Sequence, residues 1–197
     1  MASKLTTLAQ QRSASQLQVL SKESYNWLIK KVAELRGVSS IASSLSKEKE
    51  RITSRFKVGG LYYFYYDPKT KANLPYYDRF PLVLVLDINT DGFLGLNLHY
   101  LPLRYRLAFL DKLMDYAILD DNDDIKRIKV TYDILTASRS LREFKPCLKK
   151  YIYSHVQSKI LAVQPNEWEI AVHLPIQQFK KANPEEVWQE SIQQIRK

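Results

Sequence analysis

The middle of the chain alternates apolar runs with turn residues in the pattern that antiparallel strands produce. Three runs have strand character: Leu61–Tyr66, Leu82–Ile88 and Phe93–Leu101. The second run is apolar on both faces, which predicts a central strand, and Gly95 inside the third predicts a bulge or a close backbone approach. With turns between them, the runs predict an antiparallel meander or a partly open small barrel over about residues 58–101.

Most of the remaining pattern has helical spacing, in which apolar residues recur every three or four positions. Pro146 and Pro184 each stand where the first residue of a helix would. The fold class is therefore α+β, a β-rich part followed by a mainly helical C-terminal half. The predicted helical segments are 25–35, 103–117, 147–160, 166–174 and 184–195, with a further segment centred on 130–135.

The first 57 residues have the least regular pattern. Residues 1–20 are rich in Ser, Gln, Thr and Ala and predict an arm or a weak helix. Lys47–Lys57 predicts either a short exposed helix or an extended arm. We expect residues 1–57 to be a basic N-terminal arm with one helix. Residues 58–197 are expected to be a single α+β domain, β-rich over 58–102 and helical over 103–197.

Composition argues against several classes of protein. The longest purely apolar run, Leu82–Leu86, is far shorter than the roughly 20 residues that a membrane span requires. The N-terminus lacks the apolar core of a secretory signal. The single Cys147 excludes an internal disulfide and is expected to be a buried thiol. We therefore expect no membrane partner.

The net charge of +9 is concentrated in two blocks. Residues 1–57 hold 11 basic and 4 acidic residues, and residues 137–163 hold 6 basic residues and one acidic residue. The other segments, 58–102, 103–136 and 164–197, each have a net charge of −1. Two basic blocks suit a polyanion-binding surface, although solvated basic faces have the same composition.

The catalytic patterns in the chain are each incomplete. The acidic loop at 120–124 starts like a calcium loop, but Ile125 stands where glycine is required and Thr131 where a glutamate is. The three histidines have no metal-ligand spacing, and His99 is expected to be a hydrogen-bonded structural residue. No glycine-rich phosphate loop is present. We predict no cofactor and no small-molecule substrate.

A metal-dependent nuclease is the strongest enzymatic alternative. Asp78 and Asp87 flank the Leu82–Ile88 run, and two carboxylates beside a strand can hold a divalent ion against a phosphate. Asn89 stands where the usual lysine would, and Asp78 has a structural explanation in a tight turn. The sequence therefore favours a protein that is not an enzyme.

The stretch from Gly60 to Asp87 holds six of the thirteen tyrosines. On a strand, Tyr63 and Tyr65 share one face, which could be exposed and stack on unpaired bases. Residues 58–102 have a net charge of −1, however, and tyrosine packs well on strand surfaces. Structural packing is therefore the favoured interpretation. In the stacking alternative, nearby phosphates would be held by Lys69, Lys71 and Arg79.

Four blocks of the chain resemble one family. They are LYYFYYDPKTKANLPYYDRFPLVLVLD, DGFLGLNLHYLPLRYR, FKPCLKKYIYSHVQSKI and EWEIAVHLPIQQF, and the resemblance spans about residues 56–190. The pattern is similar to that of the DNA end protectors, or head-completion proteins, of T-even-type tailed phages. The resemblance implies a late virion protein that binds the ends of the packaged linear genome and keeps host exonucleases away from them.

Such a protein needs cations rather than catalytic groups. The implied partners are double-stranded DNA ends and other head, neck or tail proteins, in the virion and in the host cytoplasm. Lys145, Lys149 and Lys150 are expected near the N-terminus of the helix predicted after Pro146, and a helix N-terminus favours phosphate. The alternative is a structural neck, tail or baseplate protein without a DNA role, whose basic blocks meet acidic protein surfaces. The candidate DNA contacts are Arg51, Arg55, Lys57, Arg139, Arg142, Lys145, Lys149 and Lys150.

Overall fold

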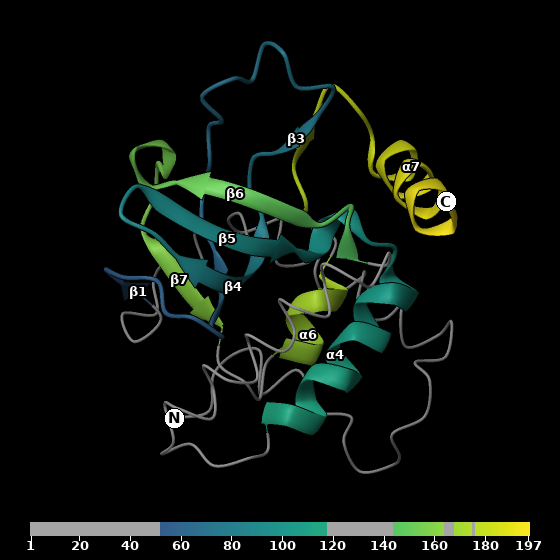
Figure 1. Cartoon of the computed structure of the whole chain (residues 1–197), viewed down its shortest axis with the longest axis horizontal. Helices are drawn as coiled ribbons and strands as arrows, with labels where there is room; N and C mark the ends of the chain where they lie inside the picture. Colours follow the sequence, from purple (N-terminus) through teal and green to yellow (C-terminus); the bar gives the residue numbers. More distant parts are fainter. Residues whose placement is uncertain (1–51, 118–143, 164–167, 175) are drawn as a thin grey trace, which may run out of the picture.

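The structure, a computed structural model, describes residues 52–117, 144–163, 168–174 and 176–197. Figure 1 shows an antiparallel sheet with two helices, α4 (Leu103–Ala117) and α6 (Trp168–His173), in the lower half of the view. A third helix, α7 (Pro184–Arg196), lies to one side. The α+β prediction is confirmed. Three predicted features lie outside the described residues: the helix at 25–35, the segment around 130–135 and the acidic loop at 120–124.

The main sheet has six strands in the order β1-β7-β2-β4-β5-β6, and each neighbouring pair is antiparallel. The adjacent strands β2, β4 and β5 are the predicted meander, which is confirmed. A separate two-stranded ribbon pairs β3 (Tyr77–Asp78) with β8 (Phe179–Lys180). The strands of the main sheet are β1 Ile52–Thr53, β2 Leu61–Tyr63, β4 Leu82–Ile88, β5 Gly92–Asn97, β6 Leu148–Ile152 and β7 Ile160–Val163.

The irregularity predicted at Gly95 is present, and it involves both strands of the β4–β5 pair. A Cβ at Gly95 would lie 2.3 Å from Cγ1 of Val83, so only glycine lets the two strands pair here without displacing that side chain. The pairing register then shifts between Val85 and Asp87, which leaves Leu86 as the extra residue of a bulge. The prediction of a close approach or a bulge is therefore confirmed, with the extra residue on the partner strand.

The prediction of a helix at 147–160 is wrong. This segment forms β6, a 3-10 turn η4 (Tyr153–His155) and β7. Its β-branched and aromatic residues suit strands, and β6 and β7 complete the ladders of β5 and β2. Pro146 lies in the turn before β6 instead of opening a helix. The β-rich part of the molecule therefore extends well beyond residue 102.

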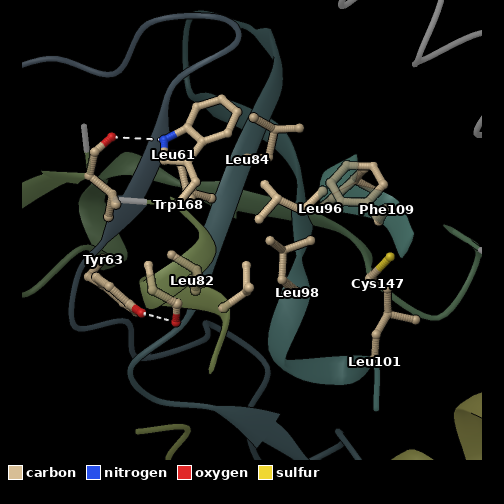
Figure 2. Packing of buried hydrophobic residues seen from close by; sticks show 14 of the residues in the cluster. Leu61, Tyr63, Leu82, Leu84, Leu96, Leu98, Leu101, Phe109, Cys147 and Trp168 are labelled. Carbon is tan, nitrogen blue, oxygen red and sulfur yellow. Dashed lines mark hydrogen bonds between the residues drawn. The ribbon is translucent and has the colours of Figure 1, made fainter. Parts of the chain in front are cut away.

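Both faces of the sheet are buried. On one face a helix-side core packs Leu61, Leu84 and Leu96 of the strands against residues of the helices such as Phe109 and Trp168 (Figure 2). The indole Nε1 of Trp168 donates a hydrogen bond to the carbonyl oxygen at the end of β7, 3.0 Å away, which ties α6 to the sheet. The helices of the described residues therefore pack on this side of the strands.

The opposite face carries a second cluster, which we call the aromatic core. Its rings include Phe56, Phe64, Phe93 and Tyr151, and the Phe56 and Phe93 ring centroids are 4.2 Å apart. The chain between β6 and β7 passes beside the residues that follow β2, where Tyr66 and Val156 form an isolated antiparallel bridge. Among the described residues the sheet is open, with β1 and β6 as its edges, so of the two predicted alternatives the meander describes it better than the barrel.

The helices predicted at 103–117 and 184–195 are confirmed. α7 begins with a capping box, in which the Asn183 side chain and Glu186 exchange hydrogen bonds with each other's backbone amides. The third predicted strand stops early at Asn97, because its side chain accepts from the His99 amide and starts a 3-10 turn, η2 (Leu98–Tyr100). Within the part of the chain that the structure describes, no helix is long and apolar enough to cross a membrane.

Candidate nucleic-acid interface

The tyrosine stretch belongs largely to the protein interior. Tyr63 is 1% exposed, its ring stacks on that of Phe80 with centroids 5.3 Å apart, and its hydroxyl donates to the Ala171 carbonyl oxygen at 2.9 Å (Figure 2). A base cannot reach a ring in this position, so the structure corrects the base-stacking prediction for Tyr63. Tyr65 is half-buried with its ring 4.7 Å from that of Phe80, and its contact with bases stays a prediction.

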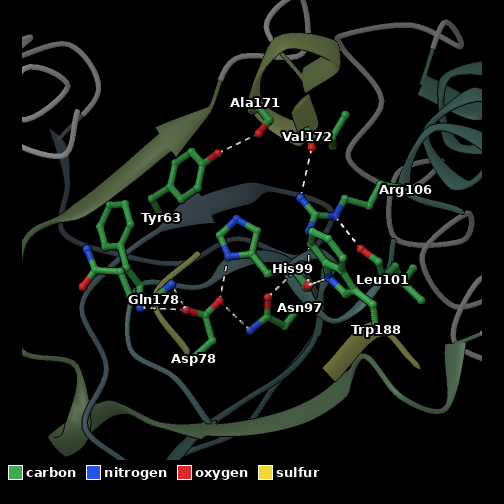
Figure 3. A network of polar contacts seen from close by, with 11 residues as sticks. Tyr63, Asp78, Asn97, His99, Leu101, Arg106, Ala171, Val172, Gln178 and Trp188 are labelled. Carbon is green, nitrogen blue, oxygen red and sulfur yellow. Dashed lines mark hydrogen bonds and ion pairs between the residues drawn. The ribbon is translucent and has the colours of Figure 1, made fainter. Parts of the chain in front are cut away.

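A buried polar network joins the β3–β8 ribbon to the sheet (Figure 3). Oδ2 of Asp78 lies 2.6 Å from Nδ1 of His99 and accepts a hydrogen bond from Nδ2 of Asn97 at 3.3 Å. Oδ1 accepts the backbone N–H groups of Phe80 and Gln178, each at 3.0 Å. The Asp78 carboxylate therefore has four partners and fixes the ribbon to the end of β5.

These contacts determine the protonation of the pair. Burial raises the pKa of Asp78, but the neighbouring His99 and the hydrogen bonds that the carboxylate accepts outweigh burial, so the pKa is lowered. Burial lowers the pKa of His99, although the carboxylate opposes the shift. His99 is therefore neutral near pH 7 and donates Nδ1–H to Asp78, while Nε2 has no hydrogen-bond partner among the described residues.

Arg106 extends the network to the helices (Figure 3). From α4 it donates hydrogen bonds to the carbonyl oxygens of Leu101, Val172 and His99, at 2.7, 3.2 and 3.2 Å. Trp188 of α7 donates from Nε1 to the same His99 oxygen at 2.9 Å. The network therefore connects the ribbon and η2 to α4, α6 and α7, so its role is to hold these elements together.

The candidate nuclease pair is not assembled. Asp78 is buried beside Asn97, which pairs with Val83 at the start of β4, whereas Asp87 is exposed and pairs with Leu94 near the other end. Four residues of strand, at about 3.3 Å each, separate these positions. Among the described residues, no group of three His, Cys, Asp or Glu side chains could hold a metal. The predicted structural roles of Asp78 and His99 are confirmed.

The predicted buried thiol is also confirmed. Cys147 is fully buried, and burial raises its pKa to about 12. Its Sγ lies 3.1 Å from the Phe144 carbonyl oxygen. A thiol in this environment is not a nucleophile.

Three candidate lysines of the second block lie on β6 or in the turn before it, and their environments differ. Lys150 is exposed and its Nζ lies 3.3 Å from Oδ2 of Asp91. Lys149 is half-buried, with its Nζ 4.2 Å from the centre of the Tyr100 ring, and burial lowers its pKa. Lys145 is exposed in the turn before β6. Only two of these three lysines therefore present a cation to solvent.

Two candidates of the first block lie close to this strand. Arg55 and Lys57 are exposed and flank Phe56, whose ring packs on Phe93 of β5. Since Phe93 pairs with the residue after Lys150, these chain segments meet at one end of the β5–β6 pair. Arg51, Arg139 and Arg142 lie outside the described residues.

A third group of cations was not predicted as a block. Lys69 and Lys71 come from the loop between β2 and β3, and Arg79 directly follows β3. Lys180 and Lys181 come from β8 and the residue after it. The ribbon pairing brings the two sets together. Summing charge along the sequence conceals this group, because 58–102 and 164–197 each have a net charge of −1.

Comparison with known proteins gives one result. The model of a family described as Phage T4 terminal DNA protecting protein matches residues 18–191, which is most of the chain. No curated protein and no solved structure matches the chain. The match agrees with the resemblance that the four sequence blocks carry.

Proposed function

Since the chain belongs to the family of the phage T4 terminal DNA protecting protein, we propose that it binds the ends of a packaged linear phage genome and shields them from host exonucleases. The family match over residues 18–191 is the observation that carries this proposal. The protein acts as a virion component, and it reaches the host cytoplasm with the DNA. It meets other virion proteins of the head, neck or tail while it is in the particle.

Protection of this kind requires no chemical step. The protein must cover a duplex end, neutralise phosphates and dissociate slowly. Exposed cations support this role, and the candidates within the described residues are Arg55, Lys57, Lys145 and Lys150. Lys149 is not among these candidates, because its ammonium group faces the Tyr100 ring.

An exonuclease assay tests the proposal. Purified protein is incubated with linear duplex DNA, a processive exonuclease is added, and the reaction is repeated with an excess of closed circular DNA. Protection that survives the circular competitor would establish binding at ends. Protection that the circles abolish, or no protection, would contradict end-specific binding and leave the structural neck, tail or baseplate role.

Substitutions identify the contacts. Replacing Arg55, Lys57 and Lys150 together by glutamine should weaken DNA binding and reduce its salt dependence, because each lost phosphate contact lowers the log–log slope by about 0.9. Lys149→Gln is the matched control: we expect a change in stability through the Tyr100 contact and little change in the salt slope. An unchanged slope in the triple variant would remove these three residues from the interface.

A further inference from the structure

The geometry points to a second phosphate-binding surface, on the β3–β8 ribbon and the loop before it. We call it the ribbon surface, and its cations are Lys69, Lys71, Arg79, Lys180 and Lys181. This inference rests on the proposed function and deepens it, because it names a part of the molecule that contacts the sugar-phosphate backbone of duplex DNA. The residues come from two segments about a hundred positions apart.

The ribbon has an inner and an outer face. Asp78 and Phe179 are a cross-strand pair that points inward, where Asp78 binds His99 and Phe179 packs on the Tyr100 ring with centroids 5.2 Å apart. Side chains alternate along a strand, so the neighbours of this pair point outward. The outward side chains are those of Tyr77, Arg79, Gln178 and Lys180, of which Arg79, Gln178 and Lys180 are exposed.

The loop that precedes β3 is fixed to the ribbon by one lysine. Nζ of Lys181 donates to the carbonyl oxygens of Lys71, Ala72 and Leu74, at 2.7, 2.9 and 2.9 Å. Lys181 has a φ of 69°, a backbone conformation that residues other than glycine adopt infrequently. Three carbonyl contacts explain why a lysine is held in this conformation. The loop is therefore ordered in advance of any ligand.

The other end of the loop is fixed to η4. The Asp67 amide donates to the His155 carbonyl oxygen at 3.1 Å, and Nδ1 of His155 lies 2.8 Å from the Asp67 carbonyl oxygen. η4 also carries Tyr153, whose ring faces that of Phe56 at 6.1 Å. Since Arg55 and Lys57 flank Phe56, η4 lies between those cations and the ribbon surface. A duplex could contact both groups.

Charge favours DNA as the partner. The ribbon surface has five cations, and three carboxylates lie near it: Asp67 pairs with Lys71 at 2.8 Å, Asp78 is buried within the ribbon, and Glu190 hydrogen-bonds Tyr76 beside β3. The cations outnumber these carboxylates, and an excess of positive charge suits a row of phosphates. The side chains of Lys69, Arg79 and Lys180 are exposed, and none of them forms an ion pair with another described residue that would compete with phosphate. Figure 1 shows the loop projecting away from α4 and α6, where a long ligand has access.

The test replaces three cations that have no structural role in the described contacts. The variant Lys69→Gln, Arg79→Gln, Lys180→Gln retains Lys71 and Lys181, which hold the loop. The matched control carries the same change in charge elsewhere on the surface, at Arg104, Lys159 and Arg196. Urea midpoints of both variants should equal that of the native chain, which verifies folding.

Binding to linear and to closed circular duplex is measured between 50 and 200 mM salt, together with exonuclease protection. Losing three phosphate contacts lowers the slope of log affinity against log salt by about 2.7, so the penalty for this fourfold rise in salt becomes about 40-fold smaller. We expect this loss in the ribbon variant and not in the control. Equal slopes in the two variants would overturn the inference.

The two proposals fail in different ways. If the native chain binds DNA without protecting ends, end protection is refuted, and the ribbon surface is still decided by the salt slopes. If the native chain protects ends and the ribbon variant protects equally well with an unchanged slope, only the ribbon surface is refuted. If the native chain binds no DNA, both are refuted, and an acidic protein surface becomes the partner to examine.

Discussion

Replacing Asp78 by alanine should destabilise the protein more than any change of an exposed carboxylate. The substitution removes the acceptor for four hydrogen-bond donors, the Nδ1–H of His99, the Nδ2 of Asn97 and two backbone amides. The two side chains can reorient, and His99 can change its tautomer. The amides of Phe80 and Gln178 cannot move without unpairing the ribbon.

The magnitude follows from those two amides. An unsatisfied buried donor costs about 1–3 kcal/mol. The Phe80 amide is buried, and the part-buried Gln178 amide adds a smaller cost. Removing one partner from a buried charged network costs about 3–5 kcal/mol in comparable cases. We therefore expect the free energy of unfolding to fall by about 3–5 kcal/mol, a large part of the roughly 5–15 kcal/mol that stabilises a typical domain.

Urea unfolding followed by circular dichroism measures this change, with Asp87→Ala as the matched control. Asp87 is exposed, and its carboxylate accepts only from the adjacent Ile88 amide, so its loss should change stability by less than about 0.5 kcal/mol. If Asp78→Ala costs no more than Asp87→Ala, the network does not hold the ribbon and the reasoning is refuted. If the native chain degrades DNA with Mg²⁺ and both variants abolish the activity, the nuclease alternative is restored.

Three further predictions follow from the same contacts. The pKa of His99 is lowered in the folded chain, so the free energy of unfolding should fall as pH drops below about 6.5, by up to about 1.4 kcal/mol per pH unit. Urea unfolding should show that His99→Gln lacks this loss of stability and that His155→Gln, the control, retains it. Cys147, with a pKa of about 12, should react with a thiol reagent at pH 8 only after unfolding; rapid reaction of the native chain would place the thiol at the surface. Lys181→Met should release the loop before β3 and speed tryptic cleavage after Lys69 or Lys71, whereas a rate equal to that of the native chain would mean that the carbonyl contacts do not hold the loop.

The elements that the sequence predicts well are those whose signals are local. Residues 82–86 are continuously apolar, which favours a central strand, and they are buried in β4. Asn183, Pro184 and Glu186 form a capping box, and α7 begins there. Leu103–Ala117 has a continuous helical stripe and is α4. In each case the neighbouring residues carry enough information to determine the structure.

The segment 147–160 shows where local information is insufficient. Pro146 and the apolar spacing after it suit a helix, yet the edge of β5 must be paired, and residues 148–152 of this segment pair it as β6. Tertiary pairing overrides a helical pattern of this strength. The consequence reaches the candidate site, because a strand separates Lys149 from Lys150 by placing them on opposite faces, whereas a helix would have grouped them.

The position of the aromatic residues bears on the proposed contact with DNA. The described helices pack on one face of the sheet. On the other face, aromatic side chains of the strands pack with Phe56, and Tyr62, Phe64 and Tyr66 are buried in this cluster. Among the side chains that the structure describes, no aromatic ring is fully exposed, while lysine and arginine occupy the exposed ribbon, loop and strand end. Contacts to phosphates position a protein without reading sequence. We therefore expect the proposed DNA binding to depend steeply on salt and hardly at all on the terminal base pairs.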